Sequence, residues 1–164
     1  MPIELDPTMH PDNAPLAWLL GTWAGAGVVG YPTMTSRNFG QEVEVTHDGR
    51  PFLHWTSRTW LLDEQGEKQE VFAVESGYWR PQPDGDVELL LAHPTGVVEM
   101  YYGKSGQAKV EVATDSIVRS PSSPEYAAAQ RLYGYVNGNL MWVMDMAAHG
   151  HEMQSYMSAE LRRV

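Results

Sequence analysis

Short runs of alternating apolar and polar residues, separated by turn-forming residues, follow one another along almost the whole chain. Runs rich in Val, Thr, Trp and Tyr with this alternation are typical of β-strands, and Gly, Pro, Asn and Asp between them mark turns. Asn137-Gly138-Asn139 is a strong hairpin signal, because Asn and Gly tolerate positive φ. The pattern predicts ten strands, at residues 22–31, 38–47, 52–62, 68–80, 86–93, 96–103, 108–118, 127–136, 139–148 and 152–162.

Ten sequential strands with short links predict an all-β fold, an antiparallel up-and-down meander that closes into a β-barrel. Closure removes exposed strand edges, and a barrel of this size has room for a small ligand inside. A short helical turn is predicted at residues 14–20, opened by Pro15, with Trp18, Leu19 and Leu20 plugging one end of the barrel. We expect residues 1–13 to be a loose tail and residues 14–164 to form a single domain.

Alternation within the last two strands suggests that both faces carry apolar groups. The last strand has Met153, Ser155, Met157, Ala159 and Leu161 on one face, and Gln154, Tyr156, Ser158 and Glu160 on the other. The strand before it has Leu140, Trp142, Met144 and Met146 on one face. This is expected where one face lines a cavity, although a plain β-sandwich also shows it.

Composition excludes several classes of function. Lys and Arg number 11 against 21 Asp and Glu, and this charge of −10 argues against nucleic acid and anionic membranes as partners. The absence of cysteine excludes disulfides, thiolate metal sites and a cysteine nucleophile. The N-terminus has no pattern of a secretory signal, which predicts a cytoplasmic protein. No protein partner can be inferred.

Local motifs assign neither a catalytic residue nor a metal site. The glycine pattern of Gly25, Gly27 and Gly30 has the letters of a dinucleotide-binding loop, but β signals follow it where a helix is required. His149 and His151 share a face of an extended strand, yet a metal site needs a third ligand from elsewhere. The tryptophans and methionines suit a pocket for a flat apolar ligand, with core packing as an equal alternative.

A combination of motifs resembles one known family. Gly21, Trp23, Gly25 and Gly27 fit the signature G-x-W-x-G-x-G, and Tyr31-Pro32-Thr33 follows it. Further matches are Pro51-Phe52-Leu53, the stretch at residues 75–80 and the A-H-P-x-G turn at residues 92–96. Together they resemble the nitrobindin family, small barrels of the lipocalin and fatty-acid-binding-protein shape, from about residue 15 to the C-terminus.

The resemblance implies a barrel that holds a b-type haem at one open end. In that family a histidine on the last strand ligates ferric iron, the ferric haem binds nitric oxide, and some members isomerise peroxynitrite to nitrate. The resemblance also suggests an architectural role for Gly21, Trp23, Gly25 and Gly27, the glycines shaping the first strand and Trp23 closing the floor of the barrel.

The chain departs from the family at the iron ligand, because Tyr156 occupies the place of the histidine. The six histidines, at positions 10, 47, 54, 93, 149 and 151, lie elsewhere. A phenol must lose a proton with a reference pKa of about 10 before it ligates iron, and a nearby cation such as Arg58 or Arg131 would be needed to lower it.

We therefore predict a nitrobindin-like small-molecule-binding barrel that lacks the axial histidine, with Tyr156, Met144 and Met146 in the ligand pocket and an unresolved ligand. The cofactor stays unknown, since loss of a ligand to the metal usually removes affinity. One alternative is a ferric haem protein, ligated through Tyr156, that binds nitric oxide or isomerises peroxynitrite. A second alternative is a carrier of an apolar ligand such as a fatty acid.

Overall fold

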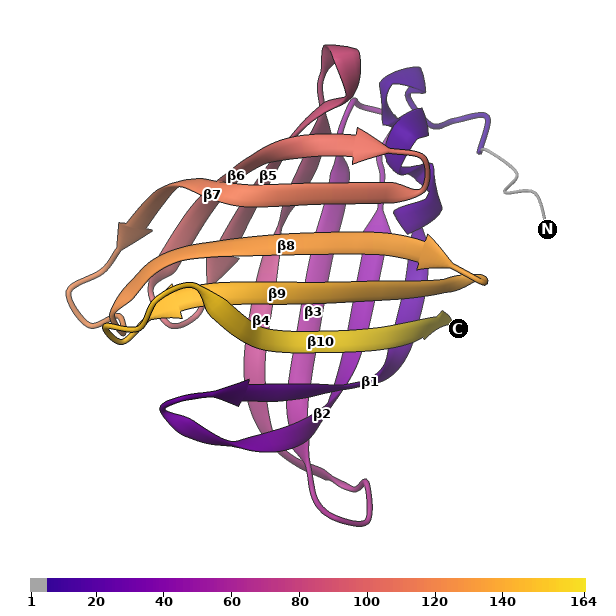
Figure 1. Cartoon of the computed structure of the whole chain (residues 1–164). Helices are drawn as coiled ribbons and strands as arrows, with labels where there is room; N and C mark the ends of the chain where they lie inside the picture. The colour runs from indigo at the N-terminus through magenta and orange to yellow at the C-terminus, as the bar shows by residue number, and fades with distance from the viewer. Residues whose placement is uncertain (1–5) are drawn as a thin grey trace.

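Ten antiparallel strands close into a barrel in the computed structural model, which describes residues 6–164 (Figure 1). Residues 1–5, part of the predicted tail, lie outside the described residues. The elements are η1 (Pro11–Leu19), β1 (Gly21–Tyr31), β2 (Met34–Thr46), β3 (Leu53–Leu62), β4 (Lys68–Pro81), η2 (Pro83–Gly85), β5 (Asp86–His93), β6 (Val97–Gly106), β7 (Lys109–Arg119), β8 (Tyr126–Val136), β9 (Asn139–Ala148) and β10 (Gln154–Arg163). No helix within residues 6–164 is long and apolar enough to cross a membrane.

The predicted fold is confirmed: each strand pairs with its neighbours in the chain, and β1 pairs with β10 to close the barrel. The largest difference in strand bounds is at β2, which begins at Met34 and not at residue 38. Tyr31 pairs directly with Met34, so that Pro32 and Thr33 alone form the turn. A two-residue hairpin turn lets the second strand resume pairing at once, and the sequence pattern did not reveal this.

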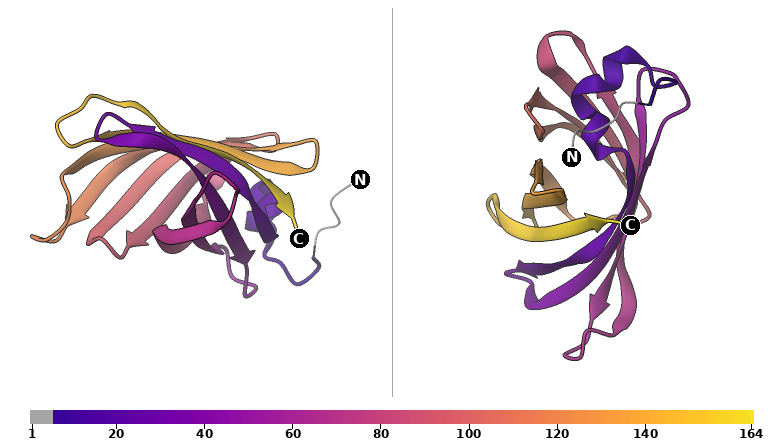
Figure 2. Two further views of the ribbon diagram at one scale, coloured as in Figure 1. Left: turned by 90° about the horizontal axis from the view of Figure 1, so that it is seen from below. Right: turned by 90° about the vertical axis from the view of Figure 1, so that its right-hand side faces the viewer.

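The helical segment η1 covers one end of the barrel (Figures 1 and 2). Leu16, Trp18 and Leu19 are buried there, whereas Leu20 is only partly buried. The indole Nε1 of Trp23 donates a hydrogen bond to the carbonyl of Leu19 at 2.9 Å, which ties the first strand to this plug. The other end, here called the mouth, is formed by the turns at residues 31–34, 62–68, 93–97, 119–126 and 148–154.

Glycines permit the close approach of β10 to β1. An ideal Cβ built on Gly27 would lie 2.1 Å from the carbonyl oxygen of Ser158 and 2.7 Å from the ring of Phe39. One built on Gly25 would lie 2.4 Å from the carbonyl oxygen of Glu160. A side chain at either position would therefore force apart the two strands that close the barrel.

We expect Gly27→Ala to destabilise the protein by about 3 kcal/mol, because the added methyl group meets backbone on one side and a buried ring on the other. For a chain of this length, that corresponds to a fall in Tm of roughly 6–12 °C by thermal unfolding. Gly106→Ala is the matched control, since no atom lies within 4 Å of its ideal Cβ. Equal Tm values for the two variants would contradict the steric interpretation.

Candidate functional site

Aromatic side chains fill the half of the barrel next to η1. The ring centroid of Tyr133 lies 5.4 Å from those of Trp55 and Trp79 and 5.9 Å from that of Trp142. Trp142 is further fixed by a hydrogen bond from its Nε1 to Gln41 at 2.8 Å. Mostly edge-to-face packing of large rings makes a rigid floor, so any ligand space must lie on the side of the mouth.

Tyr156 points into the barrel because of a β-bulge. Ser155 pairs with Asp145 and Met157 pairs with Met144, which leaves Tyr156 without a partner in the ladder. Simple alternation would send Tyr156 outward, since Met157 is buried. Its ring instead packs 6.5 Å from that of Phe72 on β4. Strands β1, β2 and β3 separate β10 from β4, so this contact crosses the interior of the barrel.

Aromatic and thioether groups surround Tyr156. The ring of Tyr31 lies 5.7 Å away in an edge-to-face arrangement, and its hydroxyl donates to the carbonyl of Met146 at 3.0 Å. Met144 and Met146 are both buried on the inner face of β9. The structure therefore gathers the three predicted pocket residues, Tyr156, Met144 and Met146, in the mouth half of the barrel.

The hydroxyl of Tyr156 is free to meet a ligand. Those of Tyr31, Tyr101, Tyr126 and Tyr133 are all hydrogen-bonded within the barrel, whereas that of Tyr156 has no partner among residues 6–164. Burial raises the pKa of Tyr156 to about 12, although the charge of Arg131 works in the opposite direction. Tyr156 is therefore a neutral phenol near pH 7, and its O–H group is able to donate a hydrogen bond.

A buried ion pair crosses the barrel opposite Tyr156. Nη1 of Arg131, on β8, donates to both carboxylate oxygens of Glu75, on β4, at 2.9 and 2.7 Å. Nε of the same side chain donates to the Tyr101 hydroxyl, and Nη1 also donates to the Tyr133 hydroxyl, both at 3.0 Å. Burial by itself lowers the pKa of Arg131, but the charge of Glu75, together with Tyr101, Tyr133 and Glu99, outweighs this effect and raises the pKa above its ordinary value.

Glu99 joins this ion pair to the mouth. Its carboxylate contacts His93 and accepts hydrogen bonds from Tyr126 and, at 2.6 Å, from Tyr101. Burial raises its pKa, but the His93 hydrogen bond and the Arg131 charge together bring the pKa down to about 2. Glu99 is therefore ionised. We call this set of connected polar side chains the polar wall; its members are Glu75, His93, Glu99, Tyr101, Tyr126, Arg131 and Tyr133. It contains two carboxylates that face one guanidinium.

The sequence pattern did not reveal this polar wall, apart from Arg131. Its residues come from β4, β6 and β8 and from the last residue of β5, and no local motif joins them. The sequence does contain one signal of the polar wall: polar residues two positions apart on the buried face of a strand. Such pairs are Glu99 with Tyr101 on β6 and Arg131 with Tyr133 on β8. Arg58, the other cation considered for lowering the pKa of the phenol, is exposed.

The remaining candidates lie outside the interior. His149 and His151 are exposed, and their rings pack 6.4 and 5.8 Å from that of Tyr31. Within residues 6–164, no group of three His, Asp or Glu side chains is arranged to hold a metal ion.

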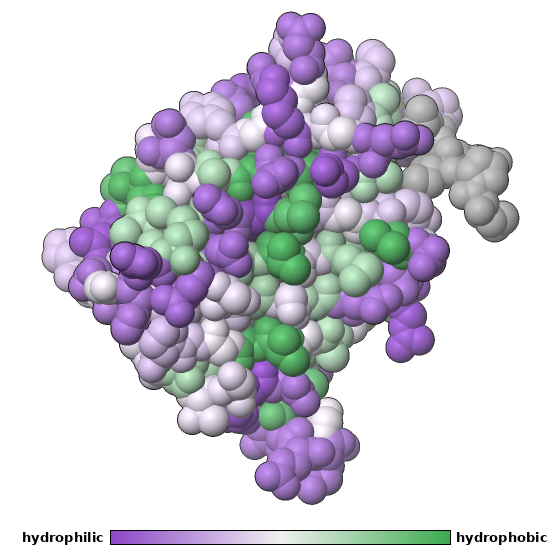
Figure 3. Space-filling view, viewed as in Figure 1, coloured by the Kyte–Doolittle hydropathy of each residue, from purple (hydrophilic) through white to green (hydrophobic). Residues whose placement is uncertain are grey.

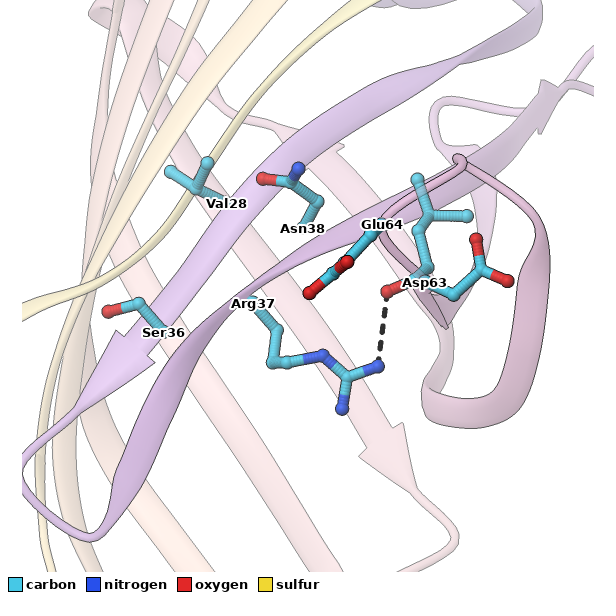
Figure 4. A pocket seen from close by; sticks show the side chains of 7 residues that line it. Val28, Ser36, Arg37, Asn38, Asp63 and Glu64 are labelled. Atoms are coloured by element: carbon cyan, nitrogen blue, oxygen red, sulfur yellow. Dashed lines mark hydrogen bonds between the residues drawn. The ribbon is translucent and has the colours of Figure 1, made fainter.

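Two hollows lie on the outer surface of the barrel. One, of about 510 Å³, lies between Val28, Asn38 and the β3–β4 turn, where Arg37 donates to the carbonyl of Leu62 at 3.1 Å (Figure 4). The other, of about 630 Å³, runs over β8, β9, β10 and β1, where apolar side chains gather (Figure 3). Neither includes Tyr156, Met144 or Met146 in its lining.

Sequence comparison relates the whole barrel to known proteins. The family described as "THAP4-like, heme-binding beta-barrel domain" matches residues 12–163. A peroxynitrite isomerase of Nocardioides sp. is 48% identical over 163 residues, covering 99% of each chain. A ferric nitrobindin-like protein of Kineococcus radiotolerans is 47% identical over 165 residues, covering 92% of each chain.

Comparison with solved structures agrees with the sequence matches. The crystal structure of Rv2717c from M. tuberculosis superposes with a TM-score of 0.85 at 32% identity, covering 95% of this chain and 99% of that one. The resemblance inferred from the motifs is thereby confirmed at the level of sequence and fold. The chain belongs to the THAP4-like, nitrobindin family of haem-binding β-barrels.

Proposed function

We propose that this barrel binds a small, flat and largely apolar molecule in its mouth half, where Tyr156 acts as a hydrogen-bond donor and not as an iron ligand. The observation that carries this proposal is Tyr156, whose ring packs against Phe72 across the interior, whose hydroxyl has no hydrogen-bond partner among residues 6–164, and whose burial keeps it protonated. Tyr31, Phe72, Met144 and Met146 offer rings and thioethers to the faces of such a molecule. Pockets of this kind combine apolar walls with a few polar groups that fix orientation.

The donor groups present fit ferric haem poorly. An imidazole ligates iron as a neutral group, whereas a phenol must first lose its proton, and burial makes that loss harder for Tyr156. Arg131 is the cation that lowers the pKa of the phenol, but Glu75 already neutralises it. These groups therefore supply no iron ligand at neutral pH, although the chain has the fold of a haem-binding family.

A ferric haem protein is the second candidate function. It is favoured by the full-length similarity to a protein named peroxynitrite isomerase. In this alternative Tyr156, as a phenolate, would ligate the iron, and the barrel would bind nitric oxide or isomerise peroxynitrite to nitrate. The two candidates differ in the protonation state of one side chain, so spectroscopy of that residue separates them.

Hemin titration followed in the Soret region tests the proposal directly. We expect weak hemin uptake by the parent chain and by Tyr156→Phe alike, because neither supplies an anionic or imidazole ligand. Tyr156→His should bind hemin about 100-fold more tightly or better, since it restores the missing ligand in an otherwise suitable pocket. Tyr102→Phe, which alters an exposed tyrosine on the outer face of β6, is the matched control.

An intense Soret band in the parent that disappears in Tyr156→Phe would establish ligation by the phenolate and favour the second candidate. If Tyr156→His also fails to take up hemin, the pocket does not accept a porphyrin. Native mass spectrometry of freshly purified protein would then show which other molecule is carried.

The ionisation of Tyr156 gives a second test. We expect its phenol to ionise near pH 12 in the folded protein, about two units above the ordinary tyrosine value. Because the folded pKa is the higher one, this residue stabilises the fold less as the pH rises from about 10 to about 12. NMR of ring-labelled tyrosine, with Tyr156→Phe to assign the signal, measures the midpoint. A midpoint below 10 would contradict the neutral phenol.

A further inference from the structure

The two side chains of the Arg131–Glu75 ion pair differ in their solvent exposure, and this difference bears on which ligands the barrel can bind. The side chain of Arg131 is 2% exposed and that of Glu75 is 15% exposed. Glu75 faces inward on β4, since it reaches Arg131 across the barrel. Glu75 is the more accessible partner and covers the guanidinium.

The surroundings of Arg131 resemble a binding site for a carboxylate. The hydroxyls of Tyr101 and Tyr133 accept hydrogen bonds from Nε and Nη1 at 3.0 Å and hold the guanidinium in one orientation. A fixed, desolvated guanidinium binds carboxylates strongly, because charge-assisted hydrogen bonds gain strength away from water. Here the carboxylate comes from the chain itself.

We propose that Arg131, Tyr101 and Tyr133 form a carboxylate site that Glu75 fills, so that Glu75 determines which ligands the barrel accepts. The consequence for ligands rests on the proposed function above. A neutral apolar molecule meets a wall whose guanidinium is already paired, whereas a molecule with a carboxylate finds the cation occupied.

The charges on the wall strengthen this exclusion. Glu99 lies 3.9 Å from Nη2 of Arg131, in addition to the bonds of Glu75 to Nη1. Arg131 therefore already has two carboxylates beside it, and Glu99 also contacts His93. A further carboxylate would be repelled by Glu75 and Glu99 in a region of low dielectric constant. This selects against fatty acids, the second alternative of the sequence analysis, on the ground of charge and not of shape.

Chemical rescue of Glu75→Ala tests the site. The truncation removes the two carbons and two oxygens that acetate contains, and it leaves Arg131 buried without its main partner. We expect the Tm to fall by about 10 °C in sodium chloride, because an unpaired buried charge is strongly destabilising. Sodium acetate at equal concentration should raise the Tm of this variant by about 2–4 °C, since binding to the folded state stabilises it.

Three controls define the result. Acetamide has the same shape without the charge and should not rescue Glu75→Ala. Glu111→Ala removes an exposed glutamate on β7 and should respond to acetate no more than the parent does. The double variant Glu75→Ala with Arg131→Met lacks the cation and should show no rescue.

A rise in Tm that acetamide matches, or that acetate gives equally to Glu111→Ala, would overturn the carboxylate site. If Glu75→Ala does not fold in chloride, recovery of folded protein by refolding in acetate supports the site, and equal failure in acetate counts against it. These outcomes use acetate as the probe and do not depend on the hemin titrations.

Selectivity is tested on the parent chain with the fluorescent fatty acid cis-parinaric acid and its methyl ester. We expect the ester to bind at least tenfold more tightly than the acid, because only the acid brings a further negative charge. Equal affinity would overturn the selectivity while leaving apolar ligand binding intact. Failure of both probes to bind would count against the proposed function and leave the acetate result unaffected.

Discussion

Closure of the barrel by the pairing of β1 with β10 is the constraint on which the rest of the structure depends. Residues 23–29 pair with residues 157–163 in continuous register, and only glycine at positions 25 and 27 leaves room for the backbone of β10. Once the sheet is closed, every inward-facing side chain meets others from across the barrel. Strands far apart in the sequence thereby share one interior, and the candidate site exists only because of this closure.

Most apolar and polar groups at the level of the mouth come from different strands, although Phe72 lies on β4 with Glu75 and Arg131 is the ladder partner of Met144. Tyr31, Tyr156, Met144 and Met146 come from β1, β9 and β10, whereas Glu75, Glu99 and Arg131 come from β4, β6 and β8. Buried charges are tolerated only where they are paired and hydrogen-bonded, and each charge of the polar wall has such partners. Under the proposed function, a ligand would meet the apolar groups and the phenol of Tyr156 on one side, and neutralised charges on the other.

Membership of a haem-binding family is compatible with the proposed role of Tyr156 as a neutral phenol and not as an iron ligand. A pocket shaped for a flat ring system keeps its apolar contacts when one side chain changes, because those contacts come from several strands. The iron ligand is a single group, and replacing an imidazole by a phenol changes the protonation chemistry without removing the cavity wall.

The sequence by itself determined the strands, the meander and the family, because alternation and turn residues are local signals and the motif of Gly21 to Gly27 is contiguous. It also identified Tyr156 as the residue in the position of the ligand. It did not determine the direction of that side chain, since strict alternation sends Tyr156 outward and only the bulge opposite Asp145 and Met144 turns it inward. The polar wall was likewise decided by tertiary structure, because Glu75, Glu99 and Arg131 become neighbours only when the closed sheet brings three separate strands to face one another.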